Sequence, residues 1–143
     1  TIGGSGHPSH PRLDAGVLRR LAGRHGGAAA SVVSEARPGE LETIPGTPYL
    51  WAEIRRAARA EKVVRLDDLL LRRVRAGLLL PDGGASLLPR LREVCREELA
   101  WDDERWSMEE HMYLARWRAN YAAPVASSEP AAPAAEAAPA LCA

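Results

Sequence analysis

Apolar residues recur at helical spacing through residues 47–81. In the first half of this stretch four of them share one helical face, at intervals of four, three and one: Leu50, Ile54, Ala57 and Ala58. Thr47 is predicted to cap this helix, and Pro48 fits its first turn, where the missing backbone N–H of proline costs nothing. The pattern therefore predicts an amphipathic helix that begins directly after Thr47.

The second half of the stretch predicts another helix after Val63 and Val64. Asp67 and Asp68 stand where the dipole of a helix N-terminus favours negative charge. Apolar residues follow them, and Gly77 is the predicted end, because glycine readily adopts the left-handed conformation that closes a helix.

Two helices are expected before this stretch. Asp14 is a suitable cap for the first helix, which would end at Gly26. The second is an alanine-rich segment at residues 28–36, which must end before Pro38 because the residue preceding a proline avoids the α conformation.

Two further helices are expected after the turn at residues 81–84. The first has Pro89 near its first turn and six apolar positions: Leu87, Leu88, Leu91, Val94, Cys95 and Leu99. The last helix begins with Asp102, Asp103 and Glu104, acids that the helix dipole favours there. Its aromatic residues recur at spacings of seven, four and four: Trp106, Tyr113, Trp117 and Tyr121.

No segment alternates in the manner of a strand, so the predicted fold is all-α, a compact bundle of five or six short helices. The helical domain is expected to span residues 12–121. Residues 1–11 are rich in glycine, proline and serine and residues 122–143 in alanine and proline, so a flexible leader and a disordered tail are expected. The chain begins at Thr1 without a methionine, which suggests a piece of a longer protein.

Composition narrows the function classes. Nineteen basic residues balance nineteen acidic ones, which argues against general attraction to nucleic acid or anionic membranes. Cys95 and Cys142 are too few and too far apart for a disulfide framework, so reduced thiols and a cytoplasmic location are expected. The leucine run at positions 78 to 80 is much shorter than a membrane span.

The residues that could bind a metal or perform catalysis are better explained by structural roles. His7 and His10 could bind a metal together, but no acid or cysteine lies nearby, and a loose leader is favoured. The run from Glu109 through His111 has one histidine where a zinc-binding helix needs two, so it is predicted to be a solvated helix face. The paired aspartates at the helix starts favour capping over acid–base catalysis, and His25 suits a helix C-terminus. No catalytic, metal-binding or cofactor-binding residue is predicted.

Charged residues of the 47–81 stretch are candidates for ion pairs between and within helices. Asp68 precedes Arg72 by four residues, the favourable orientation for a helical pair, and Glu61 precedes Arg65 in the same way. Because Arg72 and Arg73 point about 100° apart, they cannot share one partner. One of them is expected to reach Glu53 or Glu61 across the two helices. Our hypothesis is that these residues orient the two helices rather than perform chemistry.

The order of these features resembles the C-terminal helical domain of FAD-dependent glycerol-3-phosphate dehydrogenases. The matching steps span residues 13–121: Pro48-Tyr49, Ala52-Glu53, Glu61, Leu66-Asp67-Asp68-Leu69-Leu70, Arg72-Arg73, Leu99-Ala100-Trp101, and an acid-rich helix carrying Glu109 or Glu110. Arg65 and Val74 depart from the family, which usually has threonine at these places.

The resemblance implies a parent enzyme that oxidises glycerol 3-phosphate to dihydroxyacetone phosphate and passes electrons from FAD to a quinone. The parent would lie in the cytoplasm or peripherally on the cytoplasmic face of the membrane. A dinucleotide site needs a strand, a G-x-G-x-x-G turn and a helix, whereas the glycines at positions 3, 4 and 6 follow no strand. The fragment alone is therefore expected to be non-catalytic and without FAD. Its expected partner is the N-terminal flavin and substrate domain, with oligomer or membrane contacts conceivable through the parent.

Two alternatives remain open. The chain could be an independent helical protein-interaction module with no catalytic parent. Nucleic-acid binding is a weaker alternative, favoured only by a local cluster of arginines: Arg55, Arg56, Arg59, Arg72, Arg73 and Arg75. Interleaved acids and zero net charge argue against it.

Overall fold

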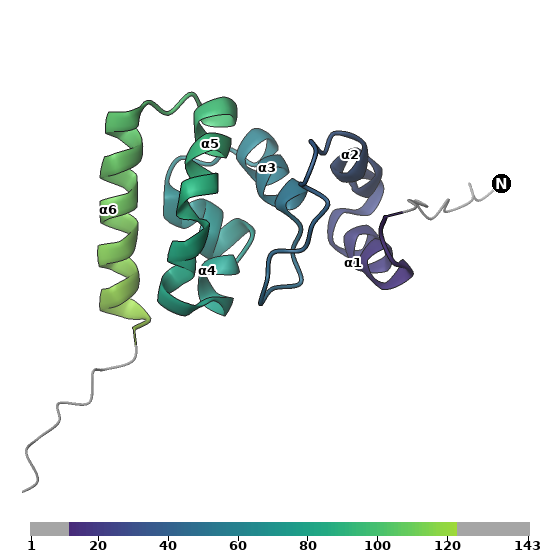
Figure 1. The fold of residues 1–143 in the computed structure, drawn as a ribbon, viewed down its shortest axis with the longest axis horizontal. Coiled ribbons are helices and arrows are strands. Elements are labelled where there is room, and N and C mark those ends of the chain that lie inside the picture. The colour runs from purple at the N-terminus through teal and green to yellow at the C-terminus, as the bar shows by residue number, and fades with distance from the viewer. Residues whose placement is uncertain (1–11, 123–143) are drawn as a thin grey trace, which may run out of the picture.

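The computed structural model describes residues 12–122, which form a row of packed helices (Figure 1). The first two helices lie at one end of the row and the last helix at the other. The α-helices are α1 (Ala15–His25), α2 (Ala29–Ser34), α3 (Trp51–Ala60), α4 (Ala76–Leu79), α5 (Leu88–Leu99) and α6 (Asp103–Asn120). Three short non-α turns lie between α1 and α2, between α3 and α4, and between α4 and α5: η1 (Gly26–Ala28), η2 (Asp68–Arg73) and η3 (Pro81–Leu87).

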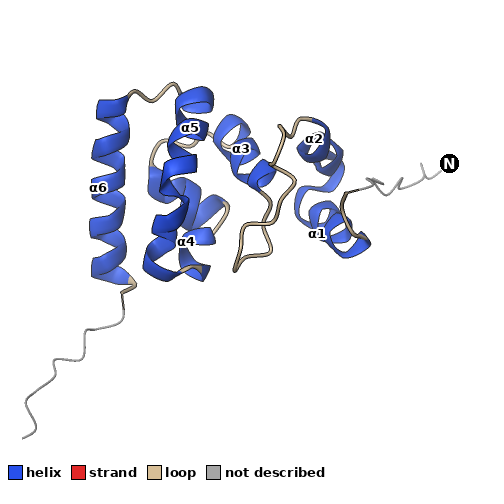
Figure 2. Cartoon of the chain, viewed as in Figure 1, coloured by secondary structure: helices blue, strands red, loops and turns tan. Residues whose placement is uncertain are grey.

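Helices and loops account for the described part of the chain (Figure 2). Between residues 12 and 122, extended pairing is limited to a single antiparallel bridge between Thr43 and Leu50. The all-α prediction is therefore confirmed. No helix within the described range is both long and apolar enough to cross a membrane.

α3 lies at the centre of the row and contributes to two hydrophobic clusters. The smaller cluster joins it to α1 and α2 through Leu21, Ala29, Val32, Leu50 and Ala52. The larger cluster joins α3 to α5, α6 and the turns between them, and its fully buried members include Ile54, Leu66, Leu69, Leu70, Val74, Leu91 and Cys95. Burial of each large aliphatic side chain contributes roughly 1.5–3 kcal/mol, so these clusters supply most of the driving force for folding.

Two predicted helix starts are confirmed by their caps. The carboxylate of Asp14 accepts a 2.9 Å hydrogen bond from the backbone N–H of Val17, and Gly26 ends α1 with a positive φ of 55°. The carboxylate of Asp102 caps α6 in the same way, accepting a 2.8 Å bond from the N–H of Arg105.

The predicted start of α3 is wrong by three residues. The helix begins at Trp51, and Glu53 Oε2 accepts a 2.8 Å hydrogen bond from the N–H of Leu50. Thr47 instead closes the preceding turn, where its hydroxyl donates to the carbonyl oxygen of Ile44 at 2.9 Å and accepts from the N–H of Tyr49 at 3.1 Å. A glutamate three residues into a helix can satisfy the backbone of the residue before it, and here this interaction sets the boundary.

The predicted end at Gly77 is also wrong. The chain forms a π-helical turn at η2, in which the N–H of Val74 bonds the carbonyl oxygen of Leu69 at 3.0 Å, and Gly77 lies inside α4. A Cβ atom at Gly77 would lie 2.2 Å from the hydroxyl oxygen of Tyr113. This glycine is needed for the close approach of α6, and not for ending a helix.

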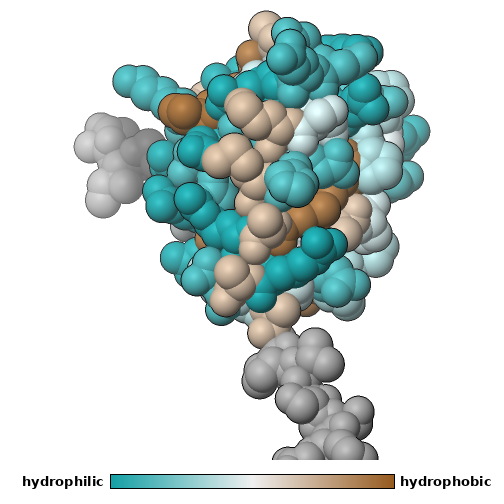
Figure 3. Space-filling model, turned by 90° about the vertical axis from the view of Figure 1, so that its left-hand side faces the viewer, coloured by the Kyte–Doolittle hydropathy of each residue, from teal (hydrophilic) through white to brown (hydrophobic). Residues whose placement is uncertain are grey.

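α6 packs through the aromatic positions that the sequence singled out. Trp106 and Tyr113 are buried, and the indole N–H of Trp117 donates to the carbonyl oxygen of Gly77 at 3.1 Å. Tyr121, at the end of this series, is half exposed. The outer face of α6 is mixed, with apolar side chains between hydrophilic ones (Figure 3).

The predicted leader at residues 1–11 lies outside the described residues, as does the predicted tail apart from Ala122. The boundaries proposed for these segments stay predictions.

Candidate functional site

A buried carboxylate, Glu53, joins α3 to α1. Its side chain is only 1% exposed, and the Arg20 guanidinium binds both of its oxygens, at 2.9 and 2.7 Å. His25 Nε2 lies 3.1 Å from Oε1, and Arg24 Nε lies 3.7 Å from the same oxygen. Burial alone would raise the pKa of Glu53, but hydrogen bonds from Arg20, the Leu50 backbone and His25 outweigh it and lower the pKa. Glu53 is therefore an ionised anchor that caps one helix and holds another.

A buried arginine, Arg55, joins α3 to α5 and to the linker before α3. Its side chain is 8% exposed and contacts three carboxylates: Glu40 at 2.6 Å, Glu97 at 2.8 Å and Glu98 at 2.8 Å. Burial would lower the pKa of Arg55, but hydrogen bonds to Glu98, Glu40 and Glu97 raise it above its ordinary value. The guanidinium fork suits this multiple pairing.

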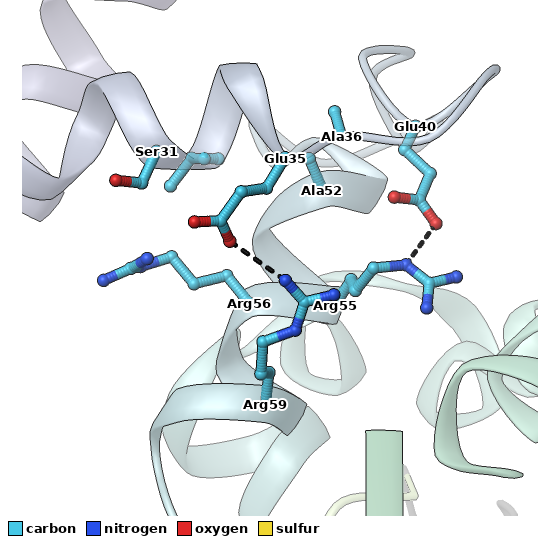
Figure 4. Close-up of a pocket in the computed structure, with 9 residues that line it drawn as sticks. Ser31, Glu35, Ala36, Glu40, Ala52, Arg55, Arg56 and Arg59 are labelled. Carbon is cyan, nitrogen blue, oxygen red and sulfur yellow. Dashed lines mark hydrogen bonds and ion pairs between the residues drawn. The ribbon is translucent and has the colours of Figure 1, made fainter. Parts of the chain in front are cut away.

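Arg59 extends the same network one helical turn further along α3 (Figure 4). It contacts Glu98 at 2.9 Å and Glu35, at the end of α2, at 3.0 Å. Hydrogen bonds from Arg59, joined by those from Arg55, lower the pKa of Glu98 to about 2. The pocket that Arg55, Arg56 and Arg59 line with α2 has a cavity volume of only about 10 Å³. Since ligand pockets usually measure roughly 300–1,000 Å³, this space does not suit a flavin.

Apart from Glu53, the ion-pair candidates of the 47–81 stretch form two exposed pairs. Arg72 lies 3.2 Å from Asp68, and its side chain is 71% exposed. Arg73 reaches Glu61 at 3.8 Å and is 46% exposed. Within residues 12–122, Glu53 contacts neither arginine and pairs with α1 instead. Of the two partners considered for the arginine pair, the structure brings only Glu61 close, and this contact is not buried.

Glu109 is the main residue that sequence reasoning misplaces. The sequence predicts it on a solvated face, yet it is 2% exposed and accepts a 3.0 Å hydrogen bond from the N–H of Leu66. Arg105 lies 2.9 Å from its Oε1, and Arg65, predicted to pair with Glu61, lies 3.8 Å from the same atom. Glu109 therefore links α6 to the chain just before η2, by accepting the backbone N–H of Leu66.

A spacing signal could have found this residue. Glu109 follows Trp106 by three positions and precedes Tyr113 by four, so it shares the aromatic face of α6. His111, which lies off that face, is exposed as predicted.

The remaining carboxylates also have structural partners. Asp68 accepts a 3.2 Å bond from the N–H of Arg65, and Asp67 pairs with Arg116. Asp103 pairs at 2.8 Å with two arginines of α5, Arg92 and Arg96.

Metal or thiol chemistry finds no support in the described residues. Over residues 12–122, no group of three or more histidine, cysteine, aspartate or glutamate side chains is arranged to hold a metal ion. His7, His10 and Cys142 lie outside this range. Burial raises the pKa of the free thiol of Cys95 to about 12, which makes it a poor nucleophile.

Several anchoring residues were missed because their partners are distant in sequence. Glu97 and Glu98 lie more than 40 positions from Arg55, and Arg20 lies 33 positions from Glu53. The one local signal was the spacing of Arg20 and Arg24, which places both on one face of α1.

Comparison with known proteins gives a consistent result. Residues 6–106 match a family model described as the C-terminal domain of alpha-glycerophosphate oxidase. The chain is 32% identical over 102 residues to a glycerol-3-phosphate dehydrogenase of Mycobacterium leprae (strain TN). It is equally similar to proteins named glycerol-3-phosphate dehydrogenase 2 in Mycobacterium bovis and Mycobacterium tuberculosis. No solved structure matches the chain.

The similarity covers 69% of this chain but only 17% of each relative, so the chain spans a small part of the length of the curated relatives it matches. The resemblance found in the sequence is confirmed at the level of the family. Because the family model covers well over half of its residues, the chain belongs to the family of C-terminal domains of alpha-glycerophosphate oxidase.

Proposed function

We propose that this chain is the C-terminal packing domain of an FAD-dependent glycerol-3-phosphate dehydrogenase. The observation that carries the proposal is the 102-residue similarity to proteins of that name, together with the family match. The parent enzyme would oxidise glycerol 3-phosphate to dihydroxyacetone phosphate and transfer electrons through FAD to a quinone. We further propose that the parent lies in the cytoplasm or on the cytoplasmic face of the membrane.

A packing role suits the arrangement of charged groups. Glu53 and Arg55 use their hydrogen-bonding capacity on neighbouring helices, which favours a rigid body over a reactive centre. The pocket between α2 and the arginines of α3 is too small for a flavin, and we assign FAD and the substrate to the remainder of the parent. When bound there, FAD would accept the hydride equivalent from the substrate. The residues of this chain would hold the helices that face that part.

A complementation experiment tests the proposal. The matched 102 residues are deleted from the Mycobacterium leprae relative, and the truncated protein is produced with and without this chain. We expect the chain to co-purify with the truncated protein, to raise its FAD content and to restore oxidation of glycerol 3-phosphate with a dye acceptor. If the chain is instead an independent interaction module, the truncated protein will neither retain it nor regain activity, and the proposal fails.

A further inference from the structure

The end of α1 contacts the end of η2, and we name the arginines of these two segments the arginine ridge: Arg24, Arg72, Arg73 and Arg75. Arg72 and Arg73 end η2, and Arg75 follows directly. Arg24, in the last turn of α1, donates a hydrogen bond to the carbonyl oxygen of Arg73. Its guanidinium also lies 4.9 Å from the centre of the Tyr49 ring, which holds it in place.

The backbone under the ridge is unusual. η2 is a π-helical turn, closed by the bond from the N–H of Val74 to the carbonyl oxygen of Leu69. Arg75 adopts a left-handed conformation with a φ of 60°, which costs a non-glycine residue roughly 1–2 kcal/mol. Short π-helical turns and strained residues concentrate at functional sites. Here both act on the segment that displays Arg72, Arg73 and Arg75.

Positive charge on the ridge exceeds the negative charge that contacts it. Asp68 pairs with Arg72, and Glu61 lies 3.8 Å from Arg73. Arg24 only shares the buried Glu53, both of whose oxygens Arg20 already binds. Arg75 is exposed and forms no ion pair with any residue that the structure describes. The ridge therefore carries a surplus of guanidinium groups.

The ion pairs already present are easily exchanged. The side chains of Arg72 and Arg73 are 71% and 46% exposed, and exposed pairs contribute only about 0–1 kcal/mol. A guanidinium that becomes desolvated against a partner's carboxylate binds much more strongly and with a defined geometry. Arginines of this kind are frequent among the residues that dominate protein interfaces.

We propose that the arginine ridge is the docking surface for a carboxylate-rich segment of the flavin-bearing portion of the parent enzyme. This inference rests on the proposed function, which supplies the partner. All four arginines lie within the matched residues 6–106, whereas most of α6, with its exposed Met108 and Met112, lies beyond them. Contacts that belong to the family architecture should therefore involve the ridge and not the outer face of α6.

The test measures the affinity of this chain for the Mycobacterium leprae relative from which the matched 102 residues are deleted. The ridge variant carries Arg72→Glu and Arg75→Glu. The control variant carries Arg19→Glu and Arg118→Glu, which change the net charge equally at exposed arginines without ion pairs in the described part of the chain. Circular dichroism and thermal unfolding confirm that both variants keep the helical fold.

We expect the ridge variant to bind at least about tenfold more weakly and the control to stay within about twofold of the original chain. Raising the salt concentration should lower the affinity of the original chain more than that of the ridge variant, because salt screens the charges of the ridge. Equal affinities of the two variants would contradict the proposal that the ridge is the docking surface, while leaving the proposed function intact.

Two other outcomes would also be decisive. Failure of the unmodified chain to bind would remove the proposed function and the ridge together. The second is DNA binding: if the unmodified chain retards a random DNA duplex in a gel-shift experiment and the ridge variant does not, the partner of the ridge is nucleic acid and not an acidic protein segment.

Discussion

The hydroxyl of Tyr113 donates a 2.6 Å hydrogen bond to the carbonyl oxygen of Gly83. Both residues are buried, and they join the middle of α6 to η3. Gly77 and Gly83 make this approach possible, because a side chain at either position would collide with an aromatic residue of α6. The contact fixes the position of the last helix on the rest of the domain.

Replacing Tyr113 with phenylalanine should destabilise the domain. Tyr113→Phe leaves the buried carbonyl oxygen of Gly83 without its donor, and an unsatisfied buried group costs about 1–3 kcal/mol. The free energy of unfolding is measured by urea titration followed by circular dichroism. Tyr121→Phe is the control, since Tyr121 is half exposed, and it should change stability by no more than about 0.5 kcal/mol. Equal effects of the two changes would contradict the role of the hydroxyl.

Gly83 should tolerate no side chain. A Cβ atom there would lie 2.8 Å from the Trp117 ring, and the φ of 68° is unfavourable for alanine. Left-handed strain and overpacking together should lower the free energy of unfolding by about 2–4 kcal/mol in Gly83→Ala. Gly23, inside α1, has open space where a Cβ atom would lie, with nothing within 4 Å, so Gly23→Ala should stabilise by about 0.5–1 kcal/mol. Urea titration of both variants checks the opposite signs.

Local sequence patterns predict the order of the helices, but they do not always predict where a helix begins or ends. Asp14 and Asp102 carry their own capping chemistry, and the structure places both as the sequence predicts. Thr47 also looks like a cap, but a side chain farther along the chain, that of Glu53, takes the Leu50 N–H and moves the helix start. Local spacing cannot decide between two possible acceptors, because the choice depends on which of them tertiary contacts hold in place.

The anchoring site is harder to predict for the same reason. Arg72 and Arg73 stand out in the sequence because they adjoin Asp68, yet they lie on the surface. Arg55 carries the buried network, and its partners Glu97 and Glu98 come from a helix about 40 residues away. Periodicity indicates which side of a helix is apolar, but it does not indicate which charged residue on its edge will be enclosed.

Removing the buried guanidinium should be costly. Arg55→Met leaves Glu40 and Glu98 without their shared cation, and breaking a buried ion pair from one side costs about 3–5 kcal/mol. The neighbouring Arg56 has no ion pair among residues 12–122, so Arg56→Met should change stability by no more than about 0.5 kcal/mol. Thermal and urea unfolding of the two variants separates these outcomes. Similar losses in both would mean that helix propensity, and not the network, sets the effect.

Neutralising Glu53 should matter more than removing either arginine of the Arg72-Arg73 pair. Glu53→Gln keeps an acceptor for the Leu50 N–H but leaves Arg20 without its buried charge partner, so we expect a loss of about 3 kcal/mol. Arg72→Ala removes only an exposed helical pair, and we expect about 0.3–0.5 kcal/mol. If Arg72→Ala lost more stability than Glu53→Gln in urea titration, the residues that orient the helices would be those of η2 and not Glu53.

Acid should weaken the domain through Glu98. Arg59 and Arg55 lower the pKa of this carboxyl to about 2 in the folded protein, whereas an ordinary glutamate titrates near 4.5. A lowered folded-state pKa stabilises the fold fully above the unfolded value, and that contribution is lost as the pH falls from about 4.5 towards 2.

The free energy of unfolding, measured at a series of pH values, should therefore decrease across this window. Glu98→Gln should be less stable than the original chain at pH 7, and the difference should shrink as the solution is acidified. Glu104→Gln is the matched control, because Glu104 is exposed and forms no ion pair within the described residues. Its profile should run parallel to that of the original chain. A constant difference between Glu98→Gln and the original chain at every pH would show that the carboxyl contributes by packing and not by its charge.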